Sequence, residues 1–128
     1  MADRIRIETP LDAAFLPVVR LVAGSLAEGA GLGFDDMDDL QLAIERLLAE
    51  AGAEGRVSIS FELGEKSLRA RVGPLREEGL AEALQSDDAA PQTLTLGRVL
   101  DTVVDSFGVE GAADGRIVVR LEKLRRAP

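Results

Sequence analysis

Hydrophobic residues recur along the chain with two different periods, and each change of period marks a predicted element. Near the start, "RIRIE" alternates, with Ile5 and Ile7 on one face, and predicts a short strand. "RVSISFEL" and "SLRARVG" alternate in the same way on either side of "GEK". They predict a hairpin with one buried and one wetter face. Further strands are predicted at "VE" and at "RIVVRLEKL", which flank a turn at "GAADG".

Two longer segments have helical spacing. The strongest signal is "GFDDMDDLQLAIERLLAEAG", where one stripe holds Met37, Leu40, Ile44, Leu47, Leu48 and Ala51. An earlier helix is predicted over "AAFLPVVRLVAGSLAEGAG", capped by Asp12 and ending near Gly29 and Gly31. Pro17 lies inside it and lacks a backbone donor, so we expect an irregular first turn or a kink.

A third helix is predicted over "TLTLGRVLDTVVDSF", with these residues inward: Leu96, Val99, Leu100, Val103, Val104 and Phe107. Before it, "PLREEGLAEALQ" predicts a short helix and "SDDAAPQ" a loop. The order strand, helix, helix, two strands, helix, strands predicts an α+β fold. We expect a two-layer α/β sandwich, with a mostly antiparallel sheet covered on one face by helices. At 128 residues the chain is predicted to be a single domain, 1–128.

Composition narrows the possible functions. With four Phe and no Trp or Tyr, the core is predicted to be aliphatic. The absence of Cys and His excludes disulfides, Cys/His zinc sites and an imidazole base, so any metal would need oxygen ligands. A net charge of -8 disfavours nucleic-acid binding. No apolar run reaches the roughly 20 residues of a membrane span, and "MADRIRIETP" lacks a signal-peptide core. We expect a cytoplasmic protein without membrane contact.

Four acids, Asp35, Asp36, Asp38 and Asp39, crowd the start of the predicted long helix. One interpretation is a cation site. However, the spacing lacks the central Gly and the terminal Glu of a calcium loop. Asp side chains also cap orphan helix amides and suit the positive end of the helix dipole. We therefore favour a structural role for these acids.

Three stretches carry a likeness to a known family: "IETPLDAAFLPVVRLVAGSLAEGAGLGFDDMDDLQLAIERLLAEA", "GRVSISFEL" running into "SLRARV", and "LTLGRVLDTVVDSF" before "GRIVVRLEK". The acidic helix start followed by "DLQLAI" is the most specific of these features. Together they resemble the anti-sigma-factor serine kinases of the GHKL ATPase superfamily, over nearly the whole chain. The resemblance implies an ATP-binding α/β sandwich that grips a sigma factor and phosphorylates an antagonist protein on serine.

The family's chemical residues are exchanged in this chain. The family's Glu base falls on Arg46, and its magnesium-holding Asn falls on Glu50. A guanidinium cannot accept a proton, so the base is lost. Glu50 could bind a metal through oxygen, but it would place a negative group beside the triphosphate. A shift of one residue in this alignment would put Glu45 or Glu50 at the base position.

Two further family motifs are degenerate. The Asp-x-Gly that reads adenine is replaced by "VGPLREEG", with Gly73 and Pro74 near the required Asp. The glycine-rich phosphate cradle is reduced to "TLTLGR", with Gly97 alone. Arg46 and Glu50, four residues apart, can be a solvated surface pair or a salt bridge that fills the vacated pocket. We expect no catalytic residue, cofactor or metal; the alternative is ATP with magnesium.

These observations predict a regulator that binds proteins and has no kinase activity. The resemblance implies a homodimer whose partner is a sigma factor, an anti-anti-sigma protein of the STAS type, or both. One alternative is an active ATP-dependent protein serine kinase, and another is a structural or assembly subunit on the same scaffold.

If the chemistry was lost, the former ATP pocket should be closed by side chains. The candidates are Arg46, Glu50, Pro74, Leu75, Leu94 and Leu96. We expect Leu94 or Leu96 to pack inward over the long helix, since burial of a Leu gains about 1.5–3 kcal/mol. An open pocket of several hundred Å³ there would instead favour an enzyme or a ligand sensor.

Overall fold

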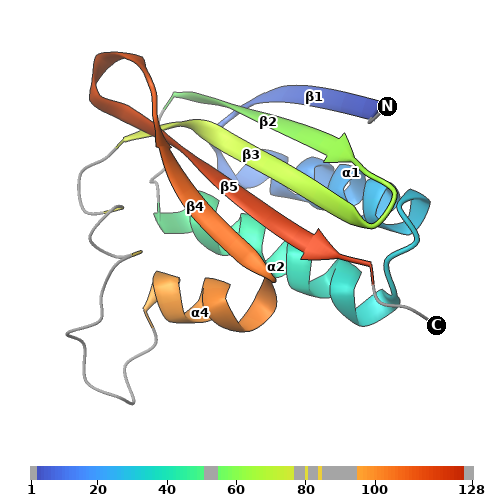
Figure 1. Ribbon diagram of the computed structural model, residues 1–128. Helices are drawn as coiled ribbons and strands as arrows, with labels where there is room; N and C mark the ends of the chain where they lie inside the picture. The colour runs from blue at the N-terminus through green and yellow to red at the C-terminus, as the bar shows by residue number, and fades with distance from the viewer. Residues whose placement is uncertain (1–2, 51–54, 77–79, 81–83, 85–94, 126–128) are drawn as a thin grey trace.

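A five-stranded antiparallel sheet forms one layer of the protein, and helices cover one of its faces (Figure 1). The computed structural model describes residues 3–50, 55–76, 80, 84 and 95–125. The strands are β1 (Asp3–Pro10), β2 (Arg56–Leu63), β3 (Ser67–Arg76), β4 (Ser106–Gly111) and β5 (Arg116–Leu124). Their order across the sheet is β1-β2-β3-β5-β4. The predicted α+β class and largely antiparallel sheet are confirmed.

The helical layer contains α1 (Leu16–Gly29), α2 (Phe34–Glu50) and α4 (Leu96–Val103). A 3-10 turn, Ala13–Phe15, leads into α1, and the Asp12 carboxylate accepts a hydrogen bond from the Ala14 amide at 2.9 Å. Pro17 follows in the first turn of α1, where a missing N–H costs no helical hydrogen bond. The predicted irregular start of this helix is confirmed.

The core lies between the helices and the inward face of the sheet. Every second residue of the three central strands is buried there: Val57, Ile59, Phe61, Leu68, Ala70, Val72, Ile117, Val119 and Leu121. From α2 the predicted stripe contributes Leu40, Ile44, Leu47 and Leu48, whereas Met37 is half-buried. Ala51 lies outside the described residues. The two hydrophobic periods therefore identified the buried faces correctly.

The third predicted helix is too long at its C-terminal end. Helix α4 stops at Val103, and Ser106 and Phe107 open β4, where Phe107 pairs with Leu121. The backbone becomes extended after α4 because it forms hydrogen bonds with the edge of β5. The first of these is donated by the Asp105 amide to the Glu122 carbonyl at 2.9 Å. Pairing with a neighbouring strand thus overrode a local helical pattern.

The stretch between β3 and α4 is described only in part. Pro74 to Arg76, predicted to belong to a short helix, continue β3 instead. Leu80 and Leu84 are helical and buried, in agreement with that helix prediction. The rest of that helix and the predicted loop "SDDAAPQ" lie outside the described residues.

Lys123 is the one charged residue among the buried side chains of the described chain, and it joins three elements. It takes the fourth inward position of β5 and is 3% exposed. Its Nζ lies 3.2 Å from Asp36 Oδ1 and 3.5 Å from Asp39 Oδ2 of α2, and it donates to the Val103 carbonyl of α4 at 2.8 Å. Asp36 and Asp39, two of the four acids at the start of α2, therefore neutralise the buried ammonium of Lys123. This is a structural role, as predicted, but the sequence did not identify Lys123 as the partner.

Candidate functional site

The two α2 positions on which the family's ATP-site residues fall in the resemblance face solvent. Arg46 and Glu50 are both exposed, and no ion pair forms between these two described residues. They are thus a solvated pair and do not fill a pocket with a salt bridge. Among the described residues, no cluster of three or more acidic, His or Cys side chains could hold a metal ion. No described helix is long and apolar enough to cross a membrane.

The start of α4, to which the resemblance would assign a phosphate cradle, is filled by the protein's own side chains. The Thr95 hydroxyl accepts a hydrogen bond from the Arg98 amide at 3.2 Å and so caps the helix. Leu96 is 3% exposed and belongs to the core, and Gly97 is buried beside it. Helix α4 lies against α2 (Figure 1). The predicted inward packing of Leu96 is confirmed, whereas Leu94 lies outside the described residues.

A bulge in β3 contains Gly73 and Pro74, which stand near the place where the resemblance expects the adenine-reading motif. Val72 pairs with Val119 and Leu75 with Ile117, so two residues of β3, Gly73 and Pro74, lie opposite the single residue Val118 of β5. Leu75 turns to the helix side, where it is 2% exposed. Pro74 instead lines a groove on the opposite face of the sheet. Of the two predicted pocket-closing residues Pro74 and Leu75, only Leu75 therefore packs on the helix side of the sheet.

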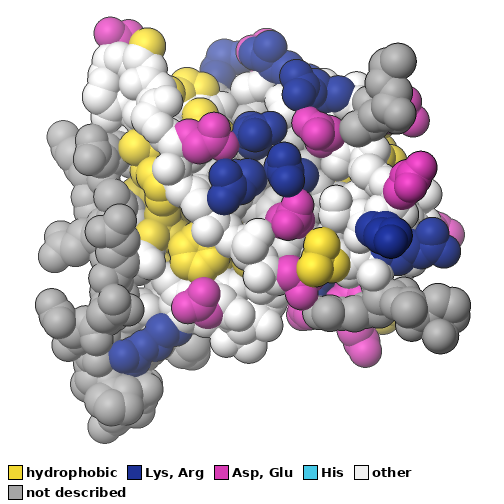
Figure 2. All heavy atoms as spheres, viewed as in Figure 1, with side chains coloured by type: hydrophobic (Ala, Val, Ile, Leu, Met, Phe, Trp, Pro, Cys, Tyr) yellow, Lys and Arg dark blue, Asp and Glu magenta, His cyan; other side chains and the backbone are white. Residues whose placement is uncertain are grey.

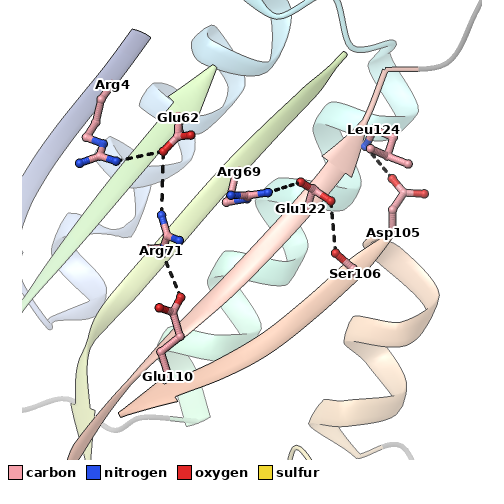
Figure 3. Close-up of polar contacts among 9 residues, drawn as sticks. All are labelled: Arg4, Glu62, Arg69, Arg71, Asp105, Ser106, Glu110, Glu122 and Leu124. Atoms are coloured by element: carbon pink, nitrogen blue, oxygen red, sulfur yellow. Dashed lines mark hydrogen bonds and ion pairs between the residues drawn. The ribbon is translucent and has the colours of Figure 1, made fainter. Parts of the chain in front are cut away.

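That opposite face is open and carries rows of charged side chains (Figure 2). One row crosses four strands, because the strand register aligns Arg4, Glu62, Arg69 and Glu122. Arg4 Nη2 lies 3.0 Å from Glu62 Oε2, and Arg69 Nη2 lies 3.0 Å from Glu122 Oε2 (Figure 3). Each base in this row has an acidic neighbour, so the row is close to neutral.

Glu62 is the acid on which most of these bases converge. The hydrogen bond from Arg4 lowers the pKa of its carboxyl, and the charges of Arg4, Arg69 and Arg71 lower it further, while partial loss of hydration opposes them. Arg71 also reaches Glu110, with Nε donating to Oε1 at 3.0 Å (Figure 3). Glu62 is consequently ionised at neutral pH, and it contacts Arg4 of β1 and Arg71 of β3 at the same time.

A groove of about 540 Å³ opens beside this row. Its lining comes from β1, β2, β3, β5 and the β4–β5 turn: Arg6, Ser58, Ser60, Arg71, Gly73, Pro74, Ala112, Ala113, Asp114, Arg116 and Val118. Three of these residues are arginines and one is an acid. The groove is therefore basic, in a chain whose net charge is -8.

The hollow exists because the centre of the sheet carries small residues. A Cβ on Gly73 would lie 2.8 Å from Val118 Cγ2 and 2.9 Å from the Ile117 carbonyl oxygen, so no side chain fits there. Ser58 and Ser60 add only short hydroxyls. The alternation along β2 and β3 predicted that this face of the hairpin is wet. It did not predict the groove, because the arginines that border it come from distant strands.

The chain matches no protein-family model and no curated protein. The likeness to anti-sigma-factor kinases thus rests on the sequence stretches, and its implications are proposals. The geometry itself describes a helix side closed by leucines and an open sheet face with a basic groove.

Proposed function

We propose that this protein is a regulator that works by binding other proteins and lacks kinase activity. Following the resemblance, its partner is a sigma factor or a STAS-type anti-anti-sigma protein, and the protein acts as a homodimer. The observation that carries the proposal is a set of large apolar side chains left in solvent on the helical layer.

These side chains occupy α1, the turn before it and the first residue of α2. Their exposed fractions are 41% for Phe15, 54% for Val18, 70% for Leu21 and 77% for Phe34. Two of the chain's four Phe residues, Phe15 and Phe34, are among these exposed side chains. Exposed groups of large apolar side chains mark interaction sites, where aromatic anchors contribute most of the affinity.

Charges beside these residues suit a basic partner. Arg20 of α1 lies 3.6 Å from Asp38 and 3.4 Å from Glu45, so α2 presents acids next to the apolar residues. The net charge of -8 adds to this negative potential. Such a field speeds the approach of positively charged partners more than it tightens the final complex.

Two features support the absence of kinase activity. Arg46 stands at the base position and cannot accept a proton, and Leu96 is buried where phosphate would need a close backbone approach. We expect millimolar ATP with magnesium to leave the melting temperature unchanged relative to magnesium alone. A bound ligand at a hundred times its dissociation constant would add about 2.7 kcal/mol. A rise of several degrees would therefore favour the active-kinase alternative.

Binding is tested with the parent chain and Leu21→Asp against the sigma factors and STAS-type proteins of the same organism. We expect Leu21→Asp to weaken the complex by about tenfold or more, as for a hot-spot residue. Val109→Asp is the matched control, because Val109 is 39% exposed on β4 and belongs to the sheet. Equal losses for both variants would contradict a helical binding surface.

Self-association separates the remaining alternative. Light scattering at high micromolar concentration should show a dimer that persists in Leu21→Asp. If Leu21→Asp abolished the dimer and no partner bound, a structural or assembly subunit would be the better conclusion.

A further inference from the structure

The basic groove on the open sheet face has the properties of a ligand site. Its volume of about 540 Å³ falls within the range of small-molecule sites. Its floor is set by main-chain packing of β3 against β5 at Gly73, so it does not depend on how long side chains happen to lie. A hollow formed in this way is present before any ligand arrives.

The arginines around the groove are oriented but not saturated. Arg71 Nε donates to Glu110 at 3.0 Å, and its Nη1 is 3.9 Å from Glu62, a loose contact. A guanidinium has five N–H donors, so most of those on Arg71 are left for a ligand. Arg116 forms no ion pair with any residue in the described parts of the chain. It stands at the first position of β5, on the groove wall.

The serines add neutral donors at the floor. Arg6 Nε donates to Ser58 Oγ at 2.6 Å, and this bond leaves the hydroxyl proton of Ser58 to point elsewhere. Ser60 lies two residues further on the same face of β2. Arginine forks together with hydroxyl donors are the usual partners of phosphate and carboxylate oxygens.

The remaining wall is apolar. Pro74, Ala112, Ala113 and Val118 line the groove without charge, and Asp114 supplies its only lining carboxylate among the described residues. Glu8 lies 3.1 Å from Arg6 and Glu110 lies 3.0 Å from Arg71, so each of these arginines is partly neutralised. Arg116 has no ion pair among the described residues and supplies the unpaired positive charge of the groove. The lining is thus matched to a molecule with a charged end and an apolar body.

We propose that this groove binds a small organic oxyanion, a phosphate ester or a carboxylate, with Arg71 and Arg116 as its charged contacts and Ser58 and Ser60 as hydroxyl donors. The site lies on the sheet face opposite the helical layer that carries the proposed partner surface. It stands independently of the proposed function, and either can fail without the other.

The experiment follows backbone amide shifts of the ¹⁵N-labelled full chain during titration. Glycerol phosphate and succinate are the two organic arms, inorganic phosphate tests the charged end alone, and sodium chloride at matched ionic strength controls for salt. We expect saturable shifts from one organic arm, centred on Ser58, Ser60, Gly73 and Arg116, with tighter binding than inorganic phosphate.

Arg116→Ala should weaken that binding by about tenfold or more, the usual cost of losing a hydrogen bond to a charged group. Arg56→Ala is the matched control, since Arg56 is also exposed, opens β2 and lies outside the groove lining. Both variants change the net charge equally. Shifts that do not saturate, that sodium chloride reproduces, that inorganic phosphate matches in affinity, or that both variants weaken equally would each overturn the proposal.

Discussion

The two faces of the sheet are made by the same strands but follow opposite rules. In β2, Phe61 is fully buried under the helices, while its neighbour Glu62 lies on the open face and bonds to Arg4. The covered face is aliphatic and closed, and the open face is polar and hollowed at Gly73. Alternation along a strand thus separates the packing of the fold from a surface that is available for binding.

Charge is treated differently on the two faces. On the covered face, Lys123 is tolerated with three oxygen partners, because an unpaired buried ammonium would be very costly. On the open face, charged side chains form linked series of ion pairs, and each exposed pair contributes little to stability. The comparison therefore predicts large effects for covered-face substitutions and small effects for their open-face neighbours.

The largest effect is expected for Phe61→Ala. Removing this fully buried ring should lower the free energy of unfolding by about 3–5 kcal/mol. The adjacent Glu62→Ala removes only an exposed ion pair and should lower the free energy of unfolding by a small fraction of that amount. Urea unfolding followed by circular dichroism measures both. Similar losses for the two variants would break the distinction between the faces.

The second effect concerns the buried charge. Lys123→Met keeps the side-chain volume but leaves Asp36, Asp39 and the Val103 carbonyl without their donor. We expect a loss of about 2–3 kcal/mol, less than the 3–5 kcal/mol for breaking a fully buried pair, because the Asp39 side chain is 39% exposed to water. Lys66→Met, at an exposed position in the β2–β3 turn, is the control and should be nearly neutral. A neutral Lys123→Met would show that the ammonium can be replaced by packing alone.

A smaller effect is expected at the floor of the groove. Gly73→Ala forces a Cβ to within 2.8 Å of Val118 and should cost about 1–3 kcal/mol, as overpacking does. Gly111→Ala, also in a strand, meets nothing within 4 Å and serves as the control. If Gly73→Ala were as stable as Gly111→Ala, the close packing of β3 against β5 at this position would be contradicted.

The smallest effect concerns the pH dependence of Glu62. Its pKa is lowered in the folded state, so folding is favoured by this group above its unfolded pKa. That contribution is lost as pH falls through the lowered folded pKa, in the acid range. Carboxyl ¹³C NMR should give a midpoint below the ordinary Glu value, and Arg4→Ala should raise it. Arg20→Ala, on α1, should leave it unchanged; an Arg4→Ala midpoint identical to that of the parent would contradict the network.

Much of the fold was predictable because its signals are local. The periods of two and 3.6 residues identified the hairpin, α2 and the buried faces, and Pro17 indicated the irregular start of α1. Part of the site was also predictable: Leu96 packs inward, and Arg46 and Glu50 fall off the apolar stripe. The end of α4 was not predictable, because Phe107 suits a helical stripe and a strand equally well, and pairing with β5 decided between them.

By itself, the sequence determined which residues of each element face the core, because that choice follows from spacing along a few neighbouring residues. The tertiary structure decided what those faces meet. It placed β5 between β3 and β4, so Lys123 reached the acids of α2, and Arg116 came to share a groove with Arg6 and Arg71. These contacts join residues far apart in the chain, and their positions depend on strand order and register, which the free energy of the whole packed sheet selects.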